Sequence, residues 1–424
     1  MLVGTVRDVT QEGACAVETE QGVVLTYGAL PGEAVRVRIR ERRQGVLRGE
    51  LERVVTLSPD RREPACTLAA RCGGCPLMSL RSEAARALKL EHVARAGQGV
   101  CLPDVLPQFE APGQELGYRR RVRLSFRKTG AGTLLGYHAA GSRLLIDAPT
   151  CLILETALQN ALSALRSALF PTLEGAGEIE LAQVEPDGVV VHVACDAPAL
   201  PALYRAAEGL VGNAGIRGVE LRDQKGAPAT FGDTRQASIA GDGLPLRAPV
   251  SSFAQANSDV NARLCALVTE LAEARGERLL ELYAGHGNLT VALARQAAEL
   301  DAFELDAPAA EACRLNLRER GLHAARVHAS DASDLANTER AVRLADTIVL
   351  DPPRGGAPGL SALVARCRPA RVVYVSCHMT TLGRDLRALA ALGYRADRVH
   401  ALDMFPQTAH IEAVVRLQRG VDPQ

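Results

Sequence analysis

A cysteine and a glutamate near the end of the chain are the residues best suited to carry out a reaction. The run Arg371–Val375 is β-branched and aromatic, so it predicts a buried strand that delivers Cys377 at its carboxyl end. In an open α/β sheet that end is where ligands bind. A thiol there can act as a nucleophile, and Glu412, at the start of the apolar strand Ile411–Leu417, can act as a base. The alternative is a buried free cysteine and a glutamate at a strand end.

Several strand ends upstream carry groups suited to a nucleoside. Gly285 and Gly287 lie in a predicted strand–turn–helix unit, where they permit close approach of the backbone to a ligand. Glu304 ends the next strand, where it can accept both ribose hydroxyls, and Asp331 ends a third, where it can take an adenine amino group. Asp351 follows a fourth strand. No Gly-x-Gly-x-x-Gly pattern is present, so a small cationic nucleoside such as S-adenosylmethionine fits better than a dinucleotide.

A group of cysteines predicts a metal centre. Cys66, Cys72 and Cys75 fall close together with two glycines between them, and the nearest sensible fourth ligand is Cys151, with Cys101 as its competitor. The Cys-x2-Cys-Pro ending is more typical of iron–sulfur sites than of the paired knuckles of structural zinc sites. We therefore predict a [4Fe–4S] cluster, with zinc or unconnected cysteines as the alternatives.

Arginines gather in two places although the net charge is zero. The run Arg119–Lys128 contains no acid, and as a strand it would turn Arg119, Arg121, Arg123 and Arg127 to one face. An RNA backbone is the favoured partner of such a face, and a solvated edge strand is the alternative. The second group lies on the later strands of the N-terminal region and forms a candidate face for phosphates, with the ordinary solvated side of those strands as the alternative: Arg36, Arg38, Arg40, Arg42, Arg43 and Arg48.

Length and composition indicate a multidomain globular protein. The chain has 424 residues, of which 47% are hydrophobic and 23% charged. Its start lacks the apolar core of a signal peptide, and no uncharged apolar run is long enough to span a membrane. Eleven cysteines in such a chain favour metal binding or catalysis over disulfides, and we expect the protein to be cytoplasmic.

The elements that must position these residues form three domains. Residues 1–57 predict five short strands and a small closed barrel of the oligonucleotide-binding type. Residues 58–250 predict an α+β central domain with helices at Ser82–Ala96 and Glu155–Leu169. Residues 251–424 alternate strand, loop and helix, which is typical of a Rossmann-like domain.

In this order the motifs resemble those of the RNA uracil-5 methyltransferases, and specifically the iron–sulfur branch that methylates 23S ribosomal RNA. The resemblance covers essentially the whole chain, and Leu402–Glu412 is its most specific segment. It implies a multidomain α/β fold: a TRAM barrel marked by Leu30–Val35, a central domain with an iron–sulfur cluster, and a class I methyltransferase domain. Ribosomal RNA is the implied partner, without membrane, and the protein is expected to be a monomer.

The resemblance also implies roles for individual residues. Cys377 would be the nucleophile and Glu412 the proton acceptor. The implied cluster ligands are Cys66, Cys72, Cys75 and Cys151. The implied contacts to S-adenosylmethionine are Gln255, Tyr283, Asn288, Glu304, Asp331 and Asp351. The substrate contacts expected are Asp351, Arg354, Gln255, Arg119 and Arg121.

Two departures from the family pattern touch the substrate side. After Cys377 the family usually has Asn-Pro, and here it is His378-Met379. The usual Tyr-Arg-Asn-Lys becomes Tyr118–Arg121. Neither change removes a catalytic group, so they bear on the RNA target more than on the chemistry.

The implied reaction begins with attack of the Cys377 thiolate on C6 of uracil, which makes C5 nucleophilic enough to take the methyl group. Glu412 then removes the C5 proton and Cys377 is eliminated.

One alternative moves the target to the T-loop of transfer RNA; the barrel and the cysteine loop argue against it, because the simpler transfer-RNA enzymes usually lack both. A non-catalytic RNA-binding factor would have lost a catalytic group, and none is missing. A radical methylase is a third alternative, but that class spaces its three cluster cysteines x3 and then x2, whereas the first gap here, from Cys66 to Cys72, is x5.

Overall fold

The chain begins as a closed five-stranded barrel. The structure is a computed structural model that describes residues 1–110, 113–224, 228–249, 252–332 and 345–420. The barrel strands, in the order β1-β2-β3-β5-β4, are β1 (Leu2–Val9), β2 (Cys15–Thr19), β3 (Gly22–Thr26), β4 (Ala34–Arg43) and β5 (Val46–Thr56). Alternate residues such as Val6, Val17 and Val37 point inward and form its core, as the period of two in a strand requires. The predicted barrel is confirmed.

The middle of the chain forms a seven-stranded sheet covered by two helices. Its order is β13-β12-β11-β10-β7-β8-β9. The strands are β7 (Arg121–Thr129), β8 (Gly132–His138), β9 (Leu145–Asp147), β10 (Ala176–Gln183), β11 (Val189–Cys195), β12 (Ile216–Arg222) and β13 (Ala229–Gly232). Leucines of α2 (Thr156–Leu169) pack with α3 (Pro201–Leu210) on the side of the sheet that carries Leu124 and Phe126.

The C-terminal part is an eight-stranded sheet, mostly parallel, in the order β18-β17-β16-β19-β20-β22-β21-β6. Its strands are β16 (Arg278–Leu282), β17 (Glu299–Glu304), β18 (Ala325–Ala329), β19 (Thr347–Leu350), β20 (Arg371–Ser376), β21 (Tyr394–Leu402), β22 (Glu412–Arg419) and β6 (Gln108–Phe109). The order reverses between β16 and β19, which is where doubly wound sheets bind ligands.

Helices cover both faces of this sheet. One core lies under α4 (Ser258–Ala272) and α5 (Thr290–Leu293). The other lies under α1 (Ser82–Gly97), α8 (Leu360–Cys367) and α9 (Met379–Ala390). Helix α6 (Ala307–Glu319) packs against β17 and β18.

Two segments lie outside the domain to which the sequence assigned them. Helix α1 packs on α9, and β6 pairs with β21, so residues 82–109 belong to the C-terminal sheet and not to the central domain. The hairpin of β14 (Gln236–Ile239) and β15 (Pro245–Ala248) packs on α6. The sequence could not predict these positions, because the local pattern of a helix or a two-residue strand does not indicate which sheet that element will join. The predicted boundary at residues 250 and 251 lies outside the described residues.

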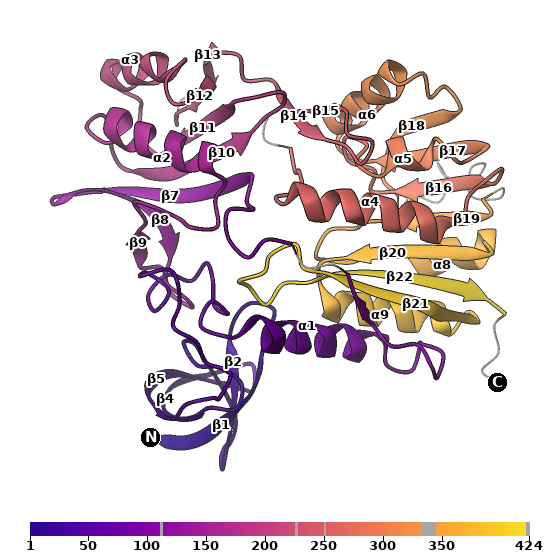
Figure 1. Ribbon diagram of the computed structural model, residues 1–424, viewed down its shortest axis with the longest axis horizontal. Helices are drawn as coiled ribbons and strands as arrows, with labels where there is room; N and C mark the ends of the chain where they lie inside the picture. The colour runs from indigo at the N-terminus through magenta and orange to yellow at the C-terminus, as the bar shows by residue number, and fades with distance from the viewer. Residues whose placement is uncertain (111–112, 225–227, 250–251, 333–344, 421–424) are drawn as a thin grey trace.

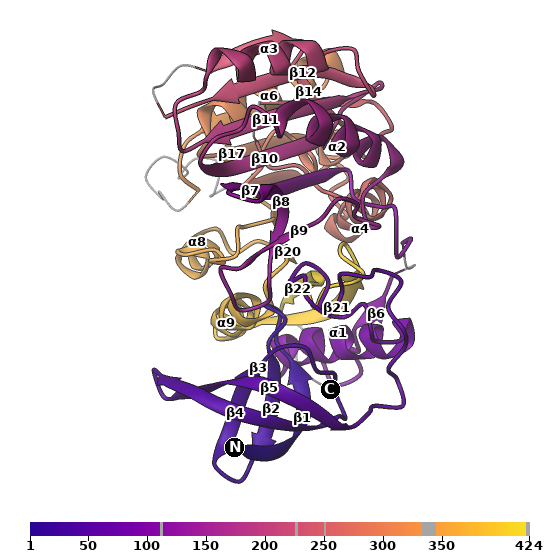
Figure 2. The ribbon, with the colours of Figure 1, turned by 90° about the vertical axis from the view of Figure 1, so that its left-hand side faces the viewer.

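The barrel and the central sheet lie against different parts of the C-terminal domain. Figure 1 shows the barrel in indigo below and to the left of α1, and the central sheet at the upper left, with α4 between it and β16. Figure 2, a quarter turn away, again places the barrel directly below α1 and α9. Among the described residues, no helix combines the length and the apolar character needed to cross a membrane.

Candidate active site

Strand pairing alone brings the two predicted catalytic residues together. Strands β20 and β22 are antiparallel, and Ser376 pairs with Ala413. The next position of that register sets Cys377 opposite Glu412. In the parallel pair of β19 and β20, Leu350 pairs with Tyr374, so Asp351 follows at the same edge of the sheet. The structure thus gathers Cys377, Glu412 and Asp351, as the sequence predicted from their strand ends.

Burial pushes all three groups toward their neutral forms. Burial, reinforced by the charges of Glu412 and Asp351, raises the pKa of Cys377 to about 11, and the guanidinium of Arg354 opposes this rise. Burial raises the pKa of Asp351 to about 7. Burial and then Asp351 raise the pKa of Glu412 well above its ordinary value. Three neighbouring groups that resist carrying negative charge suit a site that receives a cation.

Changing Asp351 to asparagine is expected to make Cys377 more reactive. The thiolate is the reactive form, so removing a neighbouring negative charge lowers the pKa of Cys377 and increases the thiolate fraction at a given pH. If the pKa of Cys377 falls by up to about one unit, its alkylation rate by iodoacetamide at about pH 9 should rise by up to about tenfold. In the unchanged protein the rate should climb about tenfold per pH unit as pH rises toward the raised pKa.

Peptide mass spectrometry reads this rate, and Cys367 on α8 provides an internal control. Burial raises the pKa of Cys367 to about 11 as well, without a contribution from Asp351. Its alkylation should be the same in both proteins. Equal Cys377 rates in the two proteins would show that Asp351 does not act on the thiol.

The predicted nucleoside residues line the same edge. Tyr283 follows β16 with a φ of 63°, and burial followed by the charge of Asp331 raises its pKa. Glu304, at the end of β17, accepts hydrogen bonds from the backbone N–H groups of Gly285 (2.8 Å) and Asp306 (2.7 Å). These bonds fix the carboxylate against the glycine turn. Gly287 has a φ of 102°, and a Cβ there would stand 3.0 Å from the Cys313 sulfur, so only glycine fits.

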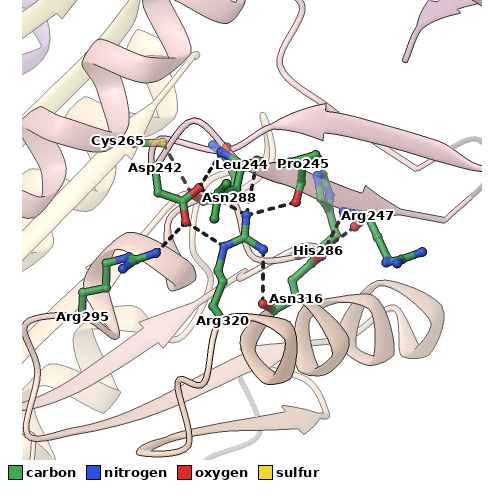
Figure 3. A network of polar contacts seen from close by, with 10 residues as sticks. All are labelled: Asp242, Leu244, Pro245, Arg247, Cys265, His286, Asn288, Arg295, Asn316 and Arg320. Carbon is green, nitrogen blue, oxygen red and sulfur yellow. Dashed lines mark hydrogen bonds and ion pairs between the residues drawn. The ribbon is translucent and has the colours of Figure 1, made fainter. Parts of the chain in front are cut away.

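A polar network holds the glycine turn from behind (Figure 3). The buried amide of Asn316 donates to the carbonyl of His286 (2.8 Å) and to that of Arg247 (2.9 Å). Arg320 lies between Asp242 and the hairpin carbonyls of Leu244 and Pro245. The hairpin β14–β15 is therefore a support of the predicted nucleoside site, which the sequence did not reveal.

Asn288 and Gln255 stand at the entrance to α4. The amides of Asn288 and Asn261 exchange two hydrogen bonds, of 2.9 and 2.8 Å, so the Asn288 side chain ties the glycine turn to the first turn of α4. Gln255 is half-buried in the segment that leads into this helix. Their contacts to a cofactor stay predictions.

Arg354 and His410 face each other beside Cys377. A guanidinium nitrogen of Arg354 lies 3.0 Å from Nε2 of His410. Burial and the charge of Arg354 lower the pKa of His410 to about 4, so this imidazole is neutral and accepts. Arg354 is exposed, which suits its predicted contact with a substrate.

The arginine face predicted for RNA is largely compensated inside the protein. Arg121 and Arg123 both pair with Glu180 of β10, a buried carboxylate. The sequence missed this because the acid comes from the neighbouring strand. Arg119 precedes β7, and its guanidinium carbon lies 5.4 Å from the centre of the Phe405 ring. It therefore points to the segment before Glu412 and not along a face of β7.

The predicted cluster cysteines lie in one region, where Cys66, Cys75 and Cys151 pack against the same small core of Met78, Tyr118 and Ile153. Burial and the proximity of Cys151, Cys72 and Cys66 together raise the pKa of Cys75 to about 12. The backbone N–H of Gly74 lies 3.4 Å from the Cys72 sulfur. Within the described residues no three His, Cys, Asp or Glu side chains stand close enough to hold one metal ion. Cys101, the competitor for the fourth place, packs against the core of the C-terminal sheet, where it forms a bridge with Ala396 of β21.

Two further residues reach the catalytic loops from distant elements. Lys89 of α1 is fully buried, with its ammonium 2.5 Å from the Asp403 carboxylate and 3.2 Å from the carbonyls of Phe405 and Pro406. Gln11, in the barrel, bonds to the backbone beside Cys377. Sequence reasoning missed both; an isolated lysine in an otherwise arginine-rich chain was the only signal.

The fold and the strand-end site define a class I methyltransferase with a small N-terminal β-barrel. Residues 234–420 match the family described as tRNA (uracil-5-)-methyltransferase. A protein of Chromohalobacter salexigens named 23S rRNA (uracil(1939)-C(5))-methyltransferase RlmD is 37% identical over 92% of this chain and 83% of its own length. The chain belongs to the RNA uracil-5 methyltransferase family, which confirms the resemblance seen in the sequence.

Two further similarities extend over most of the chain. A Pseudomonas putida protein of the same name is 36% identical over 93% of this chain and 88% of its own. A solved Pyrococcus abyssi tRNA (uracil-54, C5)-methyltransferase, in complex with S-adenosyl-L-homocysteine, has a TM-score of 0.76 and 22% identity, and covers 98% of this chain and 100% of its own.

Proposed function

We propose that the protein transfers a methyl group from S-adenosylmethionine to C5 of a uridine in 23S ribosomal RNA. The observation that carries this proposal is the register that sets Cys377 opposite Glu412 at the ligand-binding edge of a methyltransferase sheet. The names of the relatives most similar in sequence support the ribosomal substrate.

Each catalytic residue has one task in this proposal. The Cys377 thiolate bonds to C6 of the uracil, and the electron pair of the C5–C6 double bond becomes available at C5. S-adenosylmethionine supplies an electrophilic methyl group, which C5 takes. Glu412 then accepts the C5 proton, the double bond re-forms, and the thiolate leaves. The raised pKa of Glu412 fits an acceptor that must hold a proton in a buried site.

The acids along the sheet edge suit the cationic methyl donor. Glu304 and Asp331 would hold the ribose and the adenine, with Gln255, Tyr283, Asn288 and Asp351 as the other contacts. Asp351 and Arg354 would also hold the uracil by its polar edge, since one accepts and the other donates. Bound positive charge near Cys377 would favour its thiolate and offset the rise in its pKa.

A [4Fe–4S] cluster on Cys66, Cys72, Cys75 and Cys151 is part of the proposal. All four cysteines are free thiols, and burial together with the neighbouring cysteines raises the pKa of Cys72, Cys75 and Cys151, which fits a cationic group between them. Polar methyl transfer needs no electron, so the cluster would be structural.

Changing Cys75 to serine is expected to remove the brown colour and the bound iron of anaerobically purified protein. The same change at Cys101, a half-buried thiol outside the group, should leave both unaffected. Iron content and visible absorption measure the difference. Colour that persists in the Cys75 variant but not in the Cys101 variant would contradict the ligand assignment.

The exposed face of the barrel is the proposed RNA contact. Arg38 and Arg40 pair with Glu52 and Glu50, whereas Arg42, Arg43 and Arg48 are exposed and form no ion pair within the described parts of the chain. Free guanidinium groups at one end of the barrel suit phosphates. The two predicted contacts from the central domain are half-buried and already have partners within the protein. Arg119 donates to the carbonyl of Arg121, and Arg121 pairs with Glu180. A cytoplasmic monomer completes the proposal.

Transfer RNA is the second candidate, because a transfer-RNA enzyme shares this fold over nearly the whole chain. The test is to incubate anaerobically purified protein with labelled S-adenosylmethionine and either a 23S rRNA or a transfer-RNA transcript, and to identify the labelled nucleoside by mass spectrometry. 5-Methyluridine in the ribosomal transcript is the expected result. Label confined to transfer RNA would keep the chemistry and overturn the substrate. No label in either would overturn the enzyme assignment.

A further inference from the structure

The barrel reaches the loop that carries Cys377. The turn between β1 and β2 extends from the barrel to the backbone that follows β20. Gln11 in this turn is 8% exposed, and both ends of its amide are used. Its Nε2 donates to the carbonyl of Cys377 (3.3 Å), and the N–H of Met379 donates to its Oε1 (2.8 Å). One side chain therefore holds the backbone on both sides of His378.

The turn itself has a fixed shape. The N–H of Thr10 donates to the carbonyl of Ala14 (2.8 Å), and the N–H of Gly13 donates to that of Thr10 (2.8 Å). Gly13 has a φ of 80°, and a Cβ there would come within 3.0 Å of the Pro76 ring. Pro76 follows Cys75, so the turn lies between the cysteine loop and the nucleophile loop. A rigid turn holds a hydrogen-bonded partner better than a mobile one.

The body of the barrel is equally fixed relative to the site. Ala409, three residues before Glu412, is fully buried in the same core cluster as Leu77, Leu80 and the barrel interior. The N–H of Leu77 donates to the carbonyl of Gln407 (3.1 Å). Asp8 of β1 lies 2.9 Å from the ring of His92 in α1. A barrel that shares a core with the catalytic segment cannot move as an independent tethered module.

We propose that Gln11 is a positioning residue for Cys377, so that the barrel completes the active site in addition to contacting RNA. The inference rests on the proposed role of Cys377 as nucleophile. The two amide bonds set the direction in which the Cys377 backbone leaves β20, and hence the place of the sulfur. His378 caps α9 by accepting from the N–H of Thr381 (3.4 Å), so this clamp, the two hydrogen bonds of the Gln11 amide, also connects to the start of that helix.

The test compares four variants that separate the two bonds. Gln11→Ala removes both, and Gln11→Glu keeps the acceptor but loses the donor. Met379→Pro removes the N–H that donates to Gln11, together with a side chain that is buried in the core beneath α9; proline itself is well tolerated at the first position of a helix. Gln21→Ala is the matched control, because Gln21 is exposed in the turn at the other end of β2.

Two readouts are used on the intact protein: kcat and KM for methylation of the ribosomal transcript, and alkylation of Cys377 by iodoacetamide without RNA. In Gln11→Ala we expect kcat to fall about tenfold or more with KM within about twofold, the pattern of lost alignment. Cys377 should be alkylated severalfold faster because its loop is looser, while Cys367 keeps its rate. Gln21→Ala should match the unchanged protein.

A double-mutant comparison ties the effect to the hydrogen bond. If Gln11 and Met379 act through one bond, Gln11→Ala combined with Met379→Pro should lower kcat by less than the product of the two single-variant factors, because the shared bond is lost only once. Unchanged kcat and alkylation in Gln11→Ala, or a change confined to KM, would overturn the proposal. If the unchanged protein makes no 5-methyluridine but the alkylation rates still follow this pattern, the clamp stands and the proposed function fails.

Discussion

Replacing Glu412 by glutamine is expected to halt the reaction with the RNA still bonded to Cys377. Glutamine preserves the size of the buried side chain, which is 4% exposed, but cannot accept the C5 proton. Without that step the thiolate cannot be expelled. Turnover should fall by a factor of about 10² to 10⁴, the usual contribution of a general base, while the first methyl transfer still occurs.

Denaturing electrophoresis of labelled RNA measures the trapped complex. The Glu412→Gln protein should carry covalently bound RNA, whereas a Cys377→Ala protein should show neither bound RNA nor turnover. Normal turnover of Glu412→Gln would remove Glu412 from the mechanism. Lost turnover without an adduct would place its role before the covalent step.

Replacing Lys89 by methionine is expected to cause the largest loss of stability. Lys89 is fully buried and Asp403 is 7% exposed, and their ion pair is the link between α1 and the segment before Glu412. Without Lys89 the carboxylate stays buried and unpaired, and two backbone carbonyls lose their donor. A buried pair broken in this way costs about 3–5 kcal/mol.

Urea denaturation followed by circular dichroism tests this at two pH values. Burial raises the pKa of Asp403 and Lys89 opposes the rise, so in the variant the carboxyl protonates more readily. The loss should therefore be smaller at about pH 5 than at about pH 8, because protonation removes the unpaired charge. Lys128→Met, at a half-buried lysine, should cost little. Lys89→Met with Asp403→Asn should lose less than the sum of the two changes. Equal losses at both pH values would contradict the account.

Local patterns in the sequence were enough to predict the strand-end residues. Cys377, Glu304 and Asp351 each follow a β-branched or apolar run, and parallel strands bring their carboxyl ends to one edge. The five barrel strands were also predictable, because turn residues separate short alternating runs.

Contacts between elements far apart in the chain were not predictable from periodicity. The partner of Arg121 is Glu180 on the adjacent strand, and which strands become neighbours depends on the whole sheet. Gln11 reads as an ordinary turn residue, although it bonds to Cys377, 366 positions away. Lys89 reads as one polar position of a helix, yet α1 buries it against the segment before Glu412. Such polar contacts depend on tertiary packing and leave no local mark.

The central claim, covalent catalysis by Cys377 on a uracil ring, is tested most directly with a ribosomal transcript that carries 5-fluorouridine. In 5-fluorouridine a fluorine replaces the C5 hydrogen. After methyl transfer Glu412 therefore has no proton to remove, and the thiolate remains bonded to C6. The account predicts a stable complex of one protein with one RNA, and a peptide containing Cys377 that carries a methylated fluorouridine. An adduct on another residue, or no adduct while the ordinary transcript is methylated, would contradict it.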